Sequence, residues 1–234
     1  MLRVENLSYK YPDGHEALHD VSLFVREGEK VAVVGANGSG KSTLLLHIAG
    51  AFAVQEGRIT FRGSEGREVL RKNVGLTFQD SDDQLLMPSV IEDVSFSLIA
   101  GGMRKSDARK RAEEMLESLG IAHLAGREPH KLSGGEKRLV SFAGVLAGEP
   151  EVLALDEPSA GLDPRARRRV IEFLRRSECA LILATHDLDM ALDVCGRAVI
   201  LSGGSVMCEG ELPGLFMNRE LLEGAGLELP LRYA

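Results

Sequence analysis

Residues Gly35 to Thr43, which read GANGSGKST, have the types and spacing needed to hold phosphate. In this G-x-x-x-x-G-K-[ST] pattern, glycines let successive backbone N–H groups point at one anion, and the following helix start adds a partial positive charge. Lys41 can reach the β- and γ-phosphates of a nucleotide, and the Ser42 hydroxyl can ligate Mg²⁺. The alternative is a glycine turn that merely joins a strand to a helix, and the complete pattern disfavours it. The predicted phosphate-binding residues are Gly35, Ala36, Asn37, Gly38, Ser39, Gly40, Lys41, Ser42 and Thr43.

Two adjacent carboxylates could supply hydrolytic chemistry to such a site. Asp156 and Glu157 follow the apolar residues Val152 to Leu155, so we expect them at the carboxyl end of a buried strand. Asp156 suits Mg²⁺, directly or through water, and Glu157 can face an attacking water molecule. Two solvated acids at a strand end are the alternative, which the phosphate-binding pattern in the same chain disfavours.

Gln79 and His186 follow the apolar segments NVGLTF and ALILAT, so we expect both at the same edge of the sheet. A glutamine there can join Mg²⁺ to the attacking water, and a histidine can hold the γ-phosphate. Their position alone is equally consistent with polar loop side chains whose hydrogen bonds are satisfied locally.

These residues need a framework in which strands and helices alternate. Residues 3–11 and 17–25 alternate as strands of an antiparallel N-terminal region, and residues 30–35 form an apolar run typical of a buried central strand. After a helix over 41–49, further strands are expected at 58–63, 73–78, 151–156, 180–185, 198–204 and 205–210, with helices over 164–176 and from 187. Residues 106–120 have helical spacing within an inserted helical segment of about 80–149. The sequence predicts an α/β fold with a mostly parallel sheet.

A second glycine-rich segment, KLSGGEKR from Lys131 to Arg138, precedes a predicted helix. Ser133 and the amides of Gly134 and Gly135 at a helix start could bind another phosphate, with Glu136 next in the chain. For an isolated SGG sequence, a simple helix N-cap by Ser133 would be the favoured interpretation.

The order of GANGSGKST, LSGGEKR, VLALDEPSAGLD and THD, together with Gln79, resembles that of the ATP-binding subunits of ABC transporters. The resemblance covers essentially all 234 residues and implies a P-loop NTPase fold. It implies one ATPase domain over 1–234, with an α/β core at 1–79 and 150–234 and a helical signature subdomain at 80–149. In that family two domains bind two ATP molecules with Mg²⁺ between them, and each signature closes on the partner's ATP. A second copy of the chain is therefore the expected partner.

The same resemblance implies further roles. Tyr11 would stack on adenine, Glu157 would be the catalytic base, and His186 would contact the γ-phosphate. A loop across the dimer interface would consist of Ser159, Ala160, Gly161, Leu162 and Asp163. Two positions depart from the family pattern, because Glu136 stands where glutamine is usual and Leu139 where arginine is common.

The stretches TFQDSDDQLLMPSVIEDVSFS, YKYPDG and LEGAGLELP are similar to those of energy-coupling factor (ECF) transporters, notably cobalt and nickel importers. That resemblance implies a transmembrane coupling protein and a membrane-embedded substrate-capture component as partners. A vitamin such as biotin is the alternative cargo. The end at Ala234 suits a dedicated, homodimeric system. Asp80, Asp82 and Asp83 either form an exposed loop or contact an arginine of the transmembrane partner.

Composition bears on the competing functions. The net charge of −7 argues against a nucleic-acid surface, and no apolar run approaches the roughly 20 residues that span a bilayer. We therefore expect a peripheral protein on the cytoplasmic face of the membrane. The alternatives are a soluble ABC-type ATPase acting on nucleic acid or the ribosome, and a module that senses ATP without hydrolysing it. Only 89 positions separate Thr43 from Leu132, too few for a long coiled-coil insertion.

Overall fold

The computed structural model describes residues 1–78 and 80–233. The prediction for Gln79 therefore lies outside the described residues. The described chain forms two compact units, and each is considered by itself. The first comprises Met1–Leu76, Glu151–Glu157 and Glu178–Ala234, and the second comprises Thr77–Pro150 and Pro158–Ser177. The second unit thus includes Pro158–Ser177 in addition to the helical segment that the sequence suggested.

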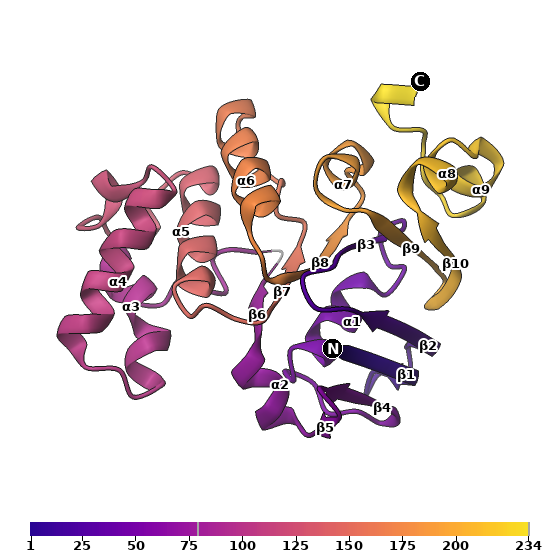
Figure 1. Cartoon of the computed structure of the whole chain (residues 1–234), viewed down its shortest axis with the longest axis horizontal. Coiled ribbons are helices and arrows are strands. Elements are labelled where there is room, and N and C mark those ends of the chain that lie inside the picture. Colours follow the sequence, from indigo (N-terminus) through magenta and orange to yellow (C-terminus); the bar gives the residue numbers. More distant parts are fainter. Residues whose placement is uncertain (79, 234) are drawn as a thin grey trace. The chain divides into compact units, whose positions relative to one another are not determined.

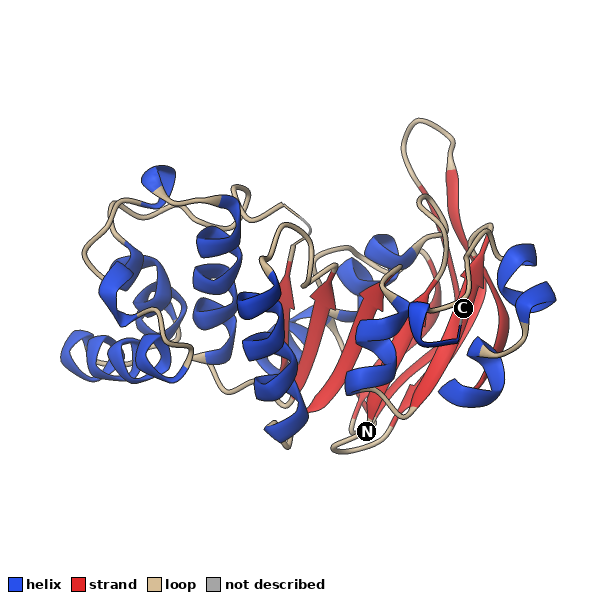
Figure 2. Ribbon diagram, turned by 90° about the horizontal axis from the view of Figure 1, so that it is seen from above, coloured by secondary structure: helices blue, strands red, loops and turns tan. Residues whose placement is uncertain are grey.

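The larger sheet of the first unit has the strand order β10-β9-β3-β8-β7-β6 (Figures 1 and 2). Its strands are β3 (Lys30–Val34), β6 (Val74–Thr77), β7 (Val152–Asp156), β8 (Ala180–Thr185), β9 (Arg197–Ser202) and β10 (Ser205–Glu211). The pairs β3–β8, β3–β9 and β7–β8 are parallel, while β9 and β10 pair antiparallel. The prediction of a mostly parallel sheet is confirmed. Strands β7 and β8 are buried at every residue, which explains their continuous apolar sequences.

The smaller sheet of the first unit is antiparallel, as the N-terminal alternation predicted. It contains β1 (Leu2–Lys10), β2 (Glu16–Val25), β4 (Glu56–Phe61) and β5 (Ser64–Glu65), in the order β2-β1-β4-β5. Buried Leu2, Val4 and Leu7 of β1 pack in the same core as Leu44 and Leu45 of α1 (Lys41–Ile48).

Helix α1 is buried on nearly all sides, because it contacts β7 and β8 of the larger sheet and β2 of the smaller one. A helix in such a position needs apolar residues all round rather than a single apolar stripe, and TLLLHI provides them. Helix α7 (Leu188–Val194) contacts β3 and β8 and lies on the opposite face of the larger sheet (Figure 1). The unit also contains α2 (Arg67–Asn73), α8 (Leu212–Phe216), α9 (Arg219–Gly224) and a 3-10 turn at Leu231–Tyr233.

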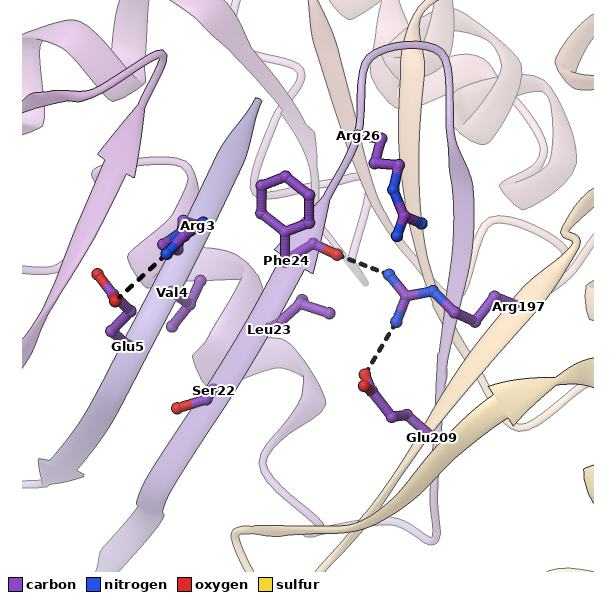
Figure 3. Close-up of a pocket in the computed structure, with 9 residues that line it drawn as sticks. All are labelled: Arg3, Val4, Glu5, Ser22, Leu23, Phe24, Arg26, Arg197 and Glu209. Carbon is purple, nitrogen blue, oxygen red and sulfur yellow. Dashed lines mark hydrogen bonds and ion pairs between the residues drawn. The ribbon is translucent and has the colours of Figure 1, made fainter.

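A groove of about 490 Å³ opens where the smaller sheet approaches β9 and β10 (Figure 3). Arg197 of β9 lies at its edge and donates hydrogen bonds to the Phe24 carbonyl of β2 (2.6 Å), to Glu29 (3.0 Å) and to Glu209 of β10 (3.0 Å). The Arg3 guanidinium lies 5.3 Å from the Phe24 ring centroid. One arginine side chain thus connects both sheets of the unit.

The second unit is helical. It contains α3 (Val90–Ala100), α4 (Lys105–Ser118), α5 (Gly134–Leu146), α6 (Pro164–Arg176) and short 3-10 turns at Ala122–Leu124 and Pro129–Lys131. The predicted helix over residues 106–120 corresponds to α4, whose buried face is formed by Ala108, Ala112 and Leu116 at a spacing of four residues. Phe142 of α5 and Phe173 of α6 meet nearly perpendicular at 6.4 Å.

Within residues 1–78 and 80–233, no helix combines the length and the apolar character that crossing a membrane requires.

Candidate nucleotide-binding site

The phosphate-binding pattern forms the loop between β3 and α1. Gly38 and Gly40 have φ angles of 78° and 100°, which non-glycine residues rarely adopt. The loop is also tightly enclosed, since a Cβ on Gly35 would lie 2.3 Å from the Leu201 carbonyl oxygen and one on Gly40 would lie 2.6 Å from that of Ala17. The glycines are therefore required by backbone conformation and by close approach, and the loop is held against β9 and β2.

Lys41 lies at the start of α1 and is 6% exposed. Its ammonium group donates to the carbonyl oxygens of Gly35 (2.7 Å) and Ala36 (3.0 Å), so the side chain folds back across the loop. Burial lowers the pKa of Lys41, while the negative charges of Glu157 and Asp156 oppose that shift. A buried cation near two carboxylates, beside a glycine-rich loop at the start of a helix, fits the phosphates of a nucleotide.

Tyr11 lies beside the same loop. Its hydroxyl is 3.1 Å from the Thr43 hydroxyl, and its ring lies 6.1 Å from that of Phe52. Tyr9 contacts Tyr11 edge-on at 5.0 Å and also contacts His47 at 4.5 Å. The predicted adenine-stacking side chain is therefore half-buried in an aromatic cluster that borders the phosphate loop.

Strand register brings two of the predicted catalytic residues, Glu157 and His186, to one edge of the larger sheet. Val34, the last residue of β3, pairs with Thr185 at the end of β8, and Asp156 of β7 pairs with Ala184 of β8. Carboxyl ends of three neighbouring parallel strands therefore meet where the phosphate loop begins, as open α/β sheets arrange their ligand sites. His186 immediately follows this edge.

Glu157 is held by two neighbours from the end of β8. Its carboxylate accepts hydrogen bonds from the Thr185 hydroxyl (2.9 Å) and the His186 backbone N–H (3.1 Å). The His186 ring nitrogen Nδ1 lies 2.8 Å from Glu157 Oε1. Glu157 is 5% exposed, whereas the His186 side chain is 64% exposed. The hydrogen bonds from Thr185 and the His186 backbone thus orient the buried carboxylate, and the His186 imidazole beside it is exposed to solvent.

Glu157 also has an unusual backbone, with a φ of 45°. Its N–H donates to the Ala184 carbonyl oxygen at 2.9 Å, which fixes the bend as the chain leaves β7. Strained non-glycine residues of this kind cluster at functional sites. Asp156 is the last residue of β7, and Glu157 lies at the bend that follows it.

The residues near the loop fit a Mg²⁺ site. Ser42 offers a half-buried hydroxyl, and Asp156 offers a carboxylate that is 5% exposed at the sheet edge. Hydroxyl, carboxylate and phosphate oxygens are the ligands that this cation takes. Gln79, the third predicted ligand, lies outside the described residues.

The second glycine-rich segment begins α5 in the second unit. Ser133 and Glu136 form a reciprocal cap, in which Glu136 Oε2 accepts from the Ser133 N–H (2.8 Å) and hydroxyl (2.8 Å), while the Glu136 N–H donates to Ser133 Oγ (3.3 Å). These hydrogen bonds from Ser133 lower the pKa of Glu136. Ser133 and Gly134 are exposed, so the helix start is open to solvent.

The loop predicted for the dimer interface contacts this helix start within the second unit. A Cβ on Gly135 would lie 3.3 Å from the Gly161 carbonyl oxygen, so the segment from Ser159 to Asp163 runs close to α5. Asp163 caps α6 by accepting from the backbone N–H groups of Arg165 (2.8 Å) and Ala166 (2.9 Å), with the Ala166 bond the larger cause of its lowered pKa.

Asp80, Asp82 and Asp83 are exposed in the second unit. The carboxylate of Asp82 forms an ion pair with Lys137 of α5, and Asp80 accepts a hydrogen bond from the Asp82 N–H at 2.9 Å. Arg138, in the next position of the same helix, donates to the Phe78 carbonyl oxygen at 2.6 Å. The structure therefore links the acidic loop to the glycine-rich helix.

Sequence reasoning missed several of these contacts. Nothing assigned a role to the Thr185 hydroxyl, to Lys137 and Arg138 as anchors of the acidic loop, or to the glycine pair at the β9–β10 turn. Gly204 of that turn donates its N–H to the Ser39 carbonyl oxygen at 3.2 Å, and a Cβ there would lie 2.8 Å from the Ala17 carbonyl oxygen. The adjacent glycines in LSGGS were the available signal for a close approach.

The fold and site define an ABC-type ATPase. CbiO1 from Clostridium perfringens, described as part of the ABC transporter complex cbiONQ, aligns with a TM-score of 0.80 and 37% identity, covering 95% of this chain and 93% of that one. The ATP-binding cassette MJ0796, described as a dimeric post-hydrolysis state bound to ADP and Pi, aligns with a TM-score of 0.83 and 29% identity, covering 91% and 99%.

Sequence comparison gives the family. Residues 18–160 match the ABC transporter family, and the chain belongs to it. The cobalt import ATP-binding protein CbiO of Rhodobacter capsulatus is 42% identical over 99% of this chain and 86% of that protein. The energy-coupling factor transporter ATP-binding protein EcfA of Carboxydothermus hydrogenoformans is 41% identical over 98% of this chain and 87% of that protein. This is accordingly an ATP-binding ATPase of the EcfA/CbiO-like group of transporter proteins.

Proposed function

We propose that the chain is the ATP-hydrolysing subunit of an ECF-type importer for a small substrate, cobalt or nickel ion. The observation that carries the hydrolytic part is the register of β3, β8 and β7, with the phosphate loop, Glu157 and His186 at one sheet edge. The names of the relatives CbiO and EcfA support the transport part, and the cobalt import name favours a metal ion over a vitamin such as biotin.

In this proposal the loop amides from Gly35 to Thr43 bind the phosphates, and Tyr11 stacks on adenine. The Lys41 ammonium group exchanges the Gly35 and Ala36 carbonyl oxygens for phosphate oxygens. The buried positive charge then stabilises the negative charge of the phosphates. Ser42, Asp156 and Gln79 would hold Mg²⁺, which would supply positive charge to the β- and γ-phosphates.

Glu157 is the general base. Its carboxylate takes a proton from the water that attacks the γ-phosphorus, so that the products are ADP and phosphate. The hydrogen bonds from Thr185 and the His186 backbone leave the carboxylate little rotational freedom. The exposed His186 imidazole donates to a γ-phosphate oxygen, and its contact with Glu157 holds it close to that position.

Two copies act together in the proposed cycle. Ser133, Gly134 and Gly135 of one copy, with Glu136, bind the γ-phosphate held by the other, and the loop from Ser159 to Asp163 lies at the interface. The dimeric state described for MJ0796 supports this arrangement. ATP binding then stabilises the dimer by mass action, and hydrolysis releases it. The acidic loop of Asp80, Asp82 and Asp83 contacts the transmembrane coupling protein at the cytoplasmic face of the membrane.

The replacement Glu157→Gln tests the catalytic assignment. It keeps the size and a hydrogen-bond acceptor but removes the base, so we expect phosphate release to fall by at least about 100-fold. We also expect a stable dimer in MgATP, measured by size-exclusion chromatography with light scattering. Rapid hydrolysis by this variant would overturn the role of Glu157.

A pull-down tests the physiological setting. Glu157→Gln with an affinity tag, purified from detergent-solubilised native cells in MgATP, should bring a second copy of the chain and integral membrane proteins. The identity of the capture component would then give the cargo. Recovery of ribosomes or nucleic acid instead would contradict the importer proposal.

A further inference from the structure

The last described residues, Ala225–Tyr233, follow α9 within the first unit. Ala225, Leu227 and Pro230 are buried, although the segment has little regular structure. In Figure 1 this yellow end of the chain lies beside α7. Burial of these three residues fixes the path of the segment, so the residues between them also occupy defined positions.

The first fixed place is Gly226, which meets the phosphate loop. It has a φ of 71°, and a Cβ added to it would lie 3.2 Å from the Ala36 methyl group. The separation is shorter than ordinary van der Waals contact between side chains. The segment therefore lies directly against the second residue of the loop, and only glycine fits there without displacing it.

The second fixed place is α7, which begins two residues after His186. The Asp189 carboxylate accepts hydrogen bonds from the backbone N–H groups of Leu231 (2.9 Å) and Arg232 (3.3 Å). The Arg232 guanidinium also donates to Asp193, one turn further along α7, at 2.8 Å. Two consecutive turns of α7 thus hold the end of the segment.

We propose that Ala225–Tyr233 is a strap that positions the phosphate loop, with Gly226 as the positioning residue at Ala36 and α7 as its anchor. The segment spans from the loop that binds phosphate to the helix that follows the γ-phosphate histidine. Nucleotide affinity therefore depends on the strap as well as on the loop itself. This inference rests on the proposed role of Gly35–Thr43 in binding phosphate.

The direct test is Gly226→Ala. Its Cβ presses on Ala36, so we expect at least about a threefold loss of affinity for MgADP, measured by isothermal titration calorimetry on the full chain. Gly63→Ala is the matched control, because Gly63 also has a positive φ, 81°, but its Cβ would meet nothing within 4 Å. Both variants should lose thermal stability through backbone strain, and only Gly226→Ala should lose affinity.

A double variant separates the effect of the contact between residues 226 and 36 from a general loss of stability. Adding Ala36→Gly to Gly226→Ala removes the methyl group that the new Cβ meets, so the affinity should recover toward that of Ala36→Gly alone. The backbone strain at residue 226 remains, so the thermal stability should stay low. Loss of affinity that Ala36→Gly does not restore would overturn the proposed contact.

The anchor is tested by Asp189→Ala, which frees the two backbone N–H groups of the strap. It should also weaken MgADP binding, and its effect should be less than multiplicative with that of Gly226→Ala, because both changes act on the phosphate loop through the same segment. This variant decides the question alone if Gly226→Ala does not fold. Unchanged affinity in both variants refutes the strap, whereas a wild-type chain that binds no MgADP refutes the nucleotide site itself.

Discussion

At the scale of single residues, the buried His47 side chain contacts the end of the phosphate loop at Thr43. Its imidazole is fully buried, its Nδ1 lies 2.8 Å from the Thr43 carbonyl oxygen, and the Tyr9 ring contacts it edge-on. Burial lowers the pKa of His47, with the hydrogen bond to Thr43 opposing the shift. The neutral imidazole is therefore the form that the folded chain accommodates.

This lowered pKa predicts acid sensitivity. Below the unfolded pKa of about 6.5, the unfolded chain binds a proton at His47 that the folded chain resists, so the free energy of unfolding falls as pH falls below that value. Urea unfolding at pH 7.5 and pH 5.5 should show a smaller loss for His47→Asn than for the wild type. An identical loss in both would exclude His47 as a source of the pH dependence.

At the scale of elements, Arg197 connects the two sheets that enclose α1 (Figure 3). Its side chain is 20% exposed and that of Glu29 is 17% exposed, so the pair is largely shielded from solvent. Burial alone would raise the pKa of Glu29, but hydrogen bonds from Arg197 and Arg26 hold it below its usual value. The ion pair therefore stabilises the fold at pH values above the usual pKa of a glutamate. This stabilisation is lost as the pH falls through the lowered pKa of Glu29.

Arg197→Met should lower the free energy of unfolding by about 2 kcal/mol, because it removes hydrogen bonds to two carboxylates and a carbonyl while keeping most of the aliphatic volume. Arg3→Met is the matched control from the same groove, since Arg3 is 56% exposed and lies 3.7 Å from Glu5. Its effect should stay below about 1 kcal/mol. Chemical unfolding of both variants gives the comparison, and equal effects would refute the connecting role of Arg197.

The elements also show which features a sequence can reveal. Apolar runs predicted β3, β7 and β8, and the glycine pattern predicted the loop before α1, because burial and backbone conformation are encoded locally in each. The contact of Glu157 with Thr185 joins residues 28 positions apart, and that of Gly226 with Ala36 spans most of the chain. Those contacts depend on register and packing, which no local pattern records. Packing also places α6 in the same unit as α3, although the two helices are far apart in the sequence.

At the scale of the whole molecule, the acidic loop offers a test of assembly. Reversing Asp82 and Asp83 to arginine should abolish copurification of the proposed transmembrane partner, while MgADP affinity stays unchanged. Charge-assisted pairs of the proposed kind contribute roughly 1.5–3 kcal/mol each.

Lys137→Gln is the control for the assembly test, because Lys137 forms the ion pair with Asp82 inside this chain. It releases the loop without reversing its charge. If Lys137→Gln loses the partner as completely as the double reversal, loop conformation rather than charge governs assembly. Retention of the partner by the double reversal would reject the acidic contact.

The reciprocal hydrogen bonds between Ser133 and Glu136 have a consequence for the conformational entropy of closure in the proposed dimer. They order the first turn of α5 in the isolated chain, including two glycines. Fixing the backbone of each residue costs about 1–2 kcal/mol in conformational entropy. This entropy cost is incurred when the chain folds and would not be incurred again when two copies associate. In the proposed dimer, closure over nucleotide would require Ser133 to exchange hydrogen-bond partners, but it would not require the nucleation of a helix.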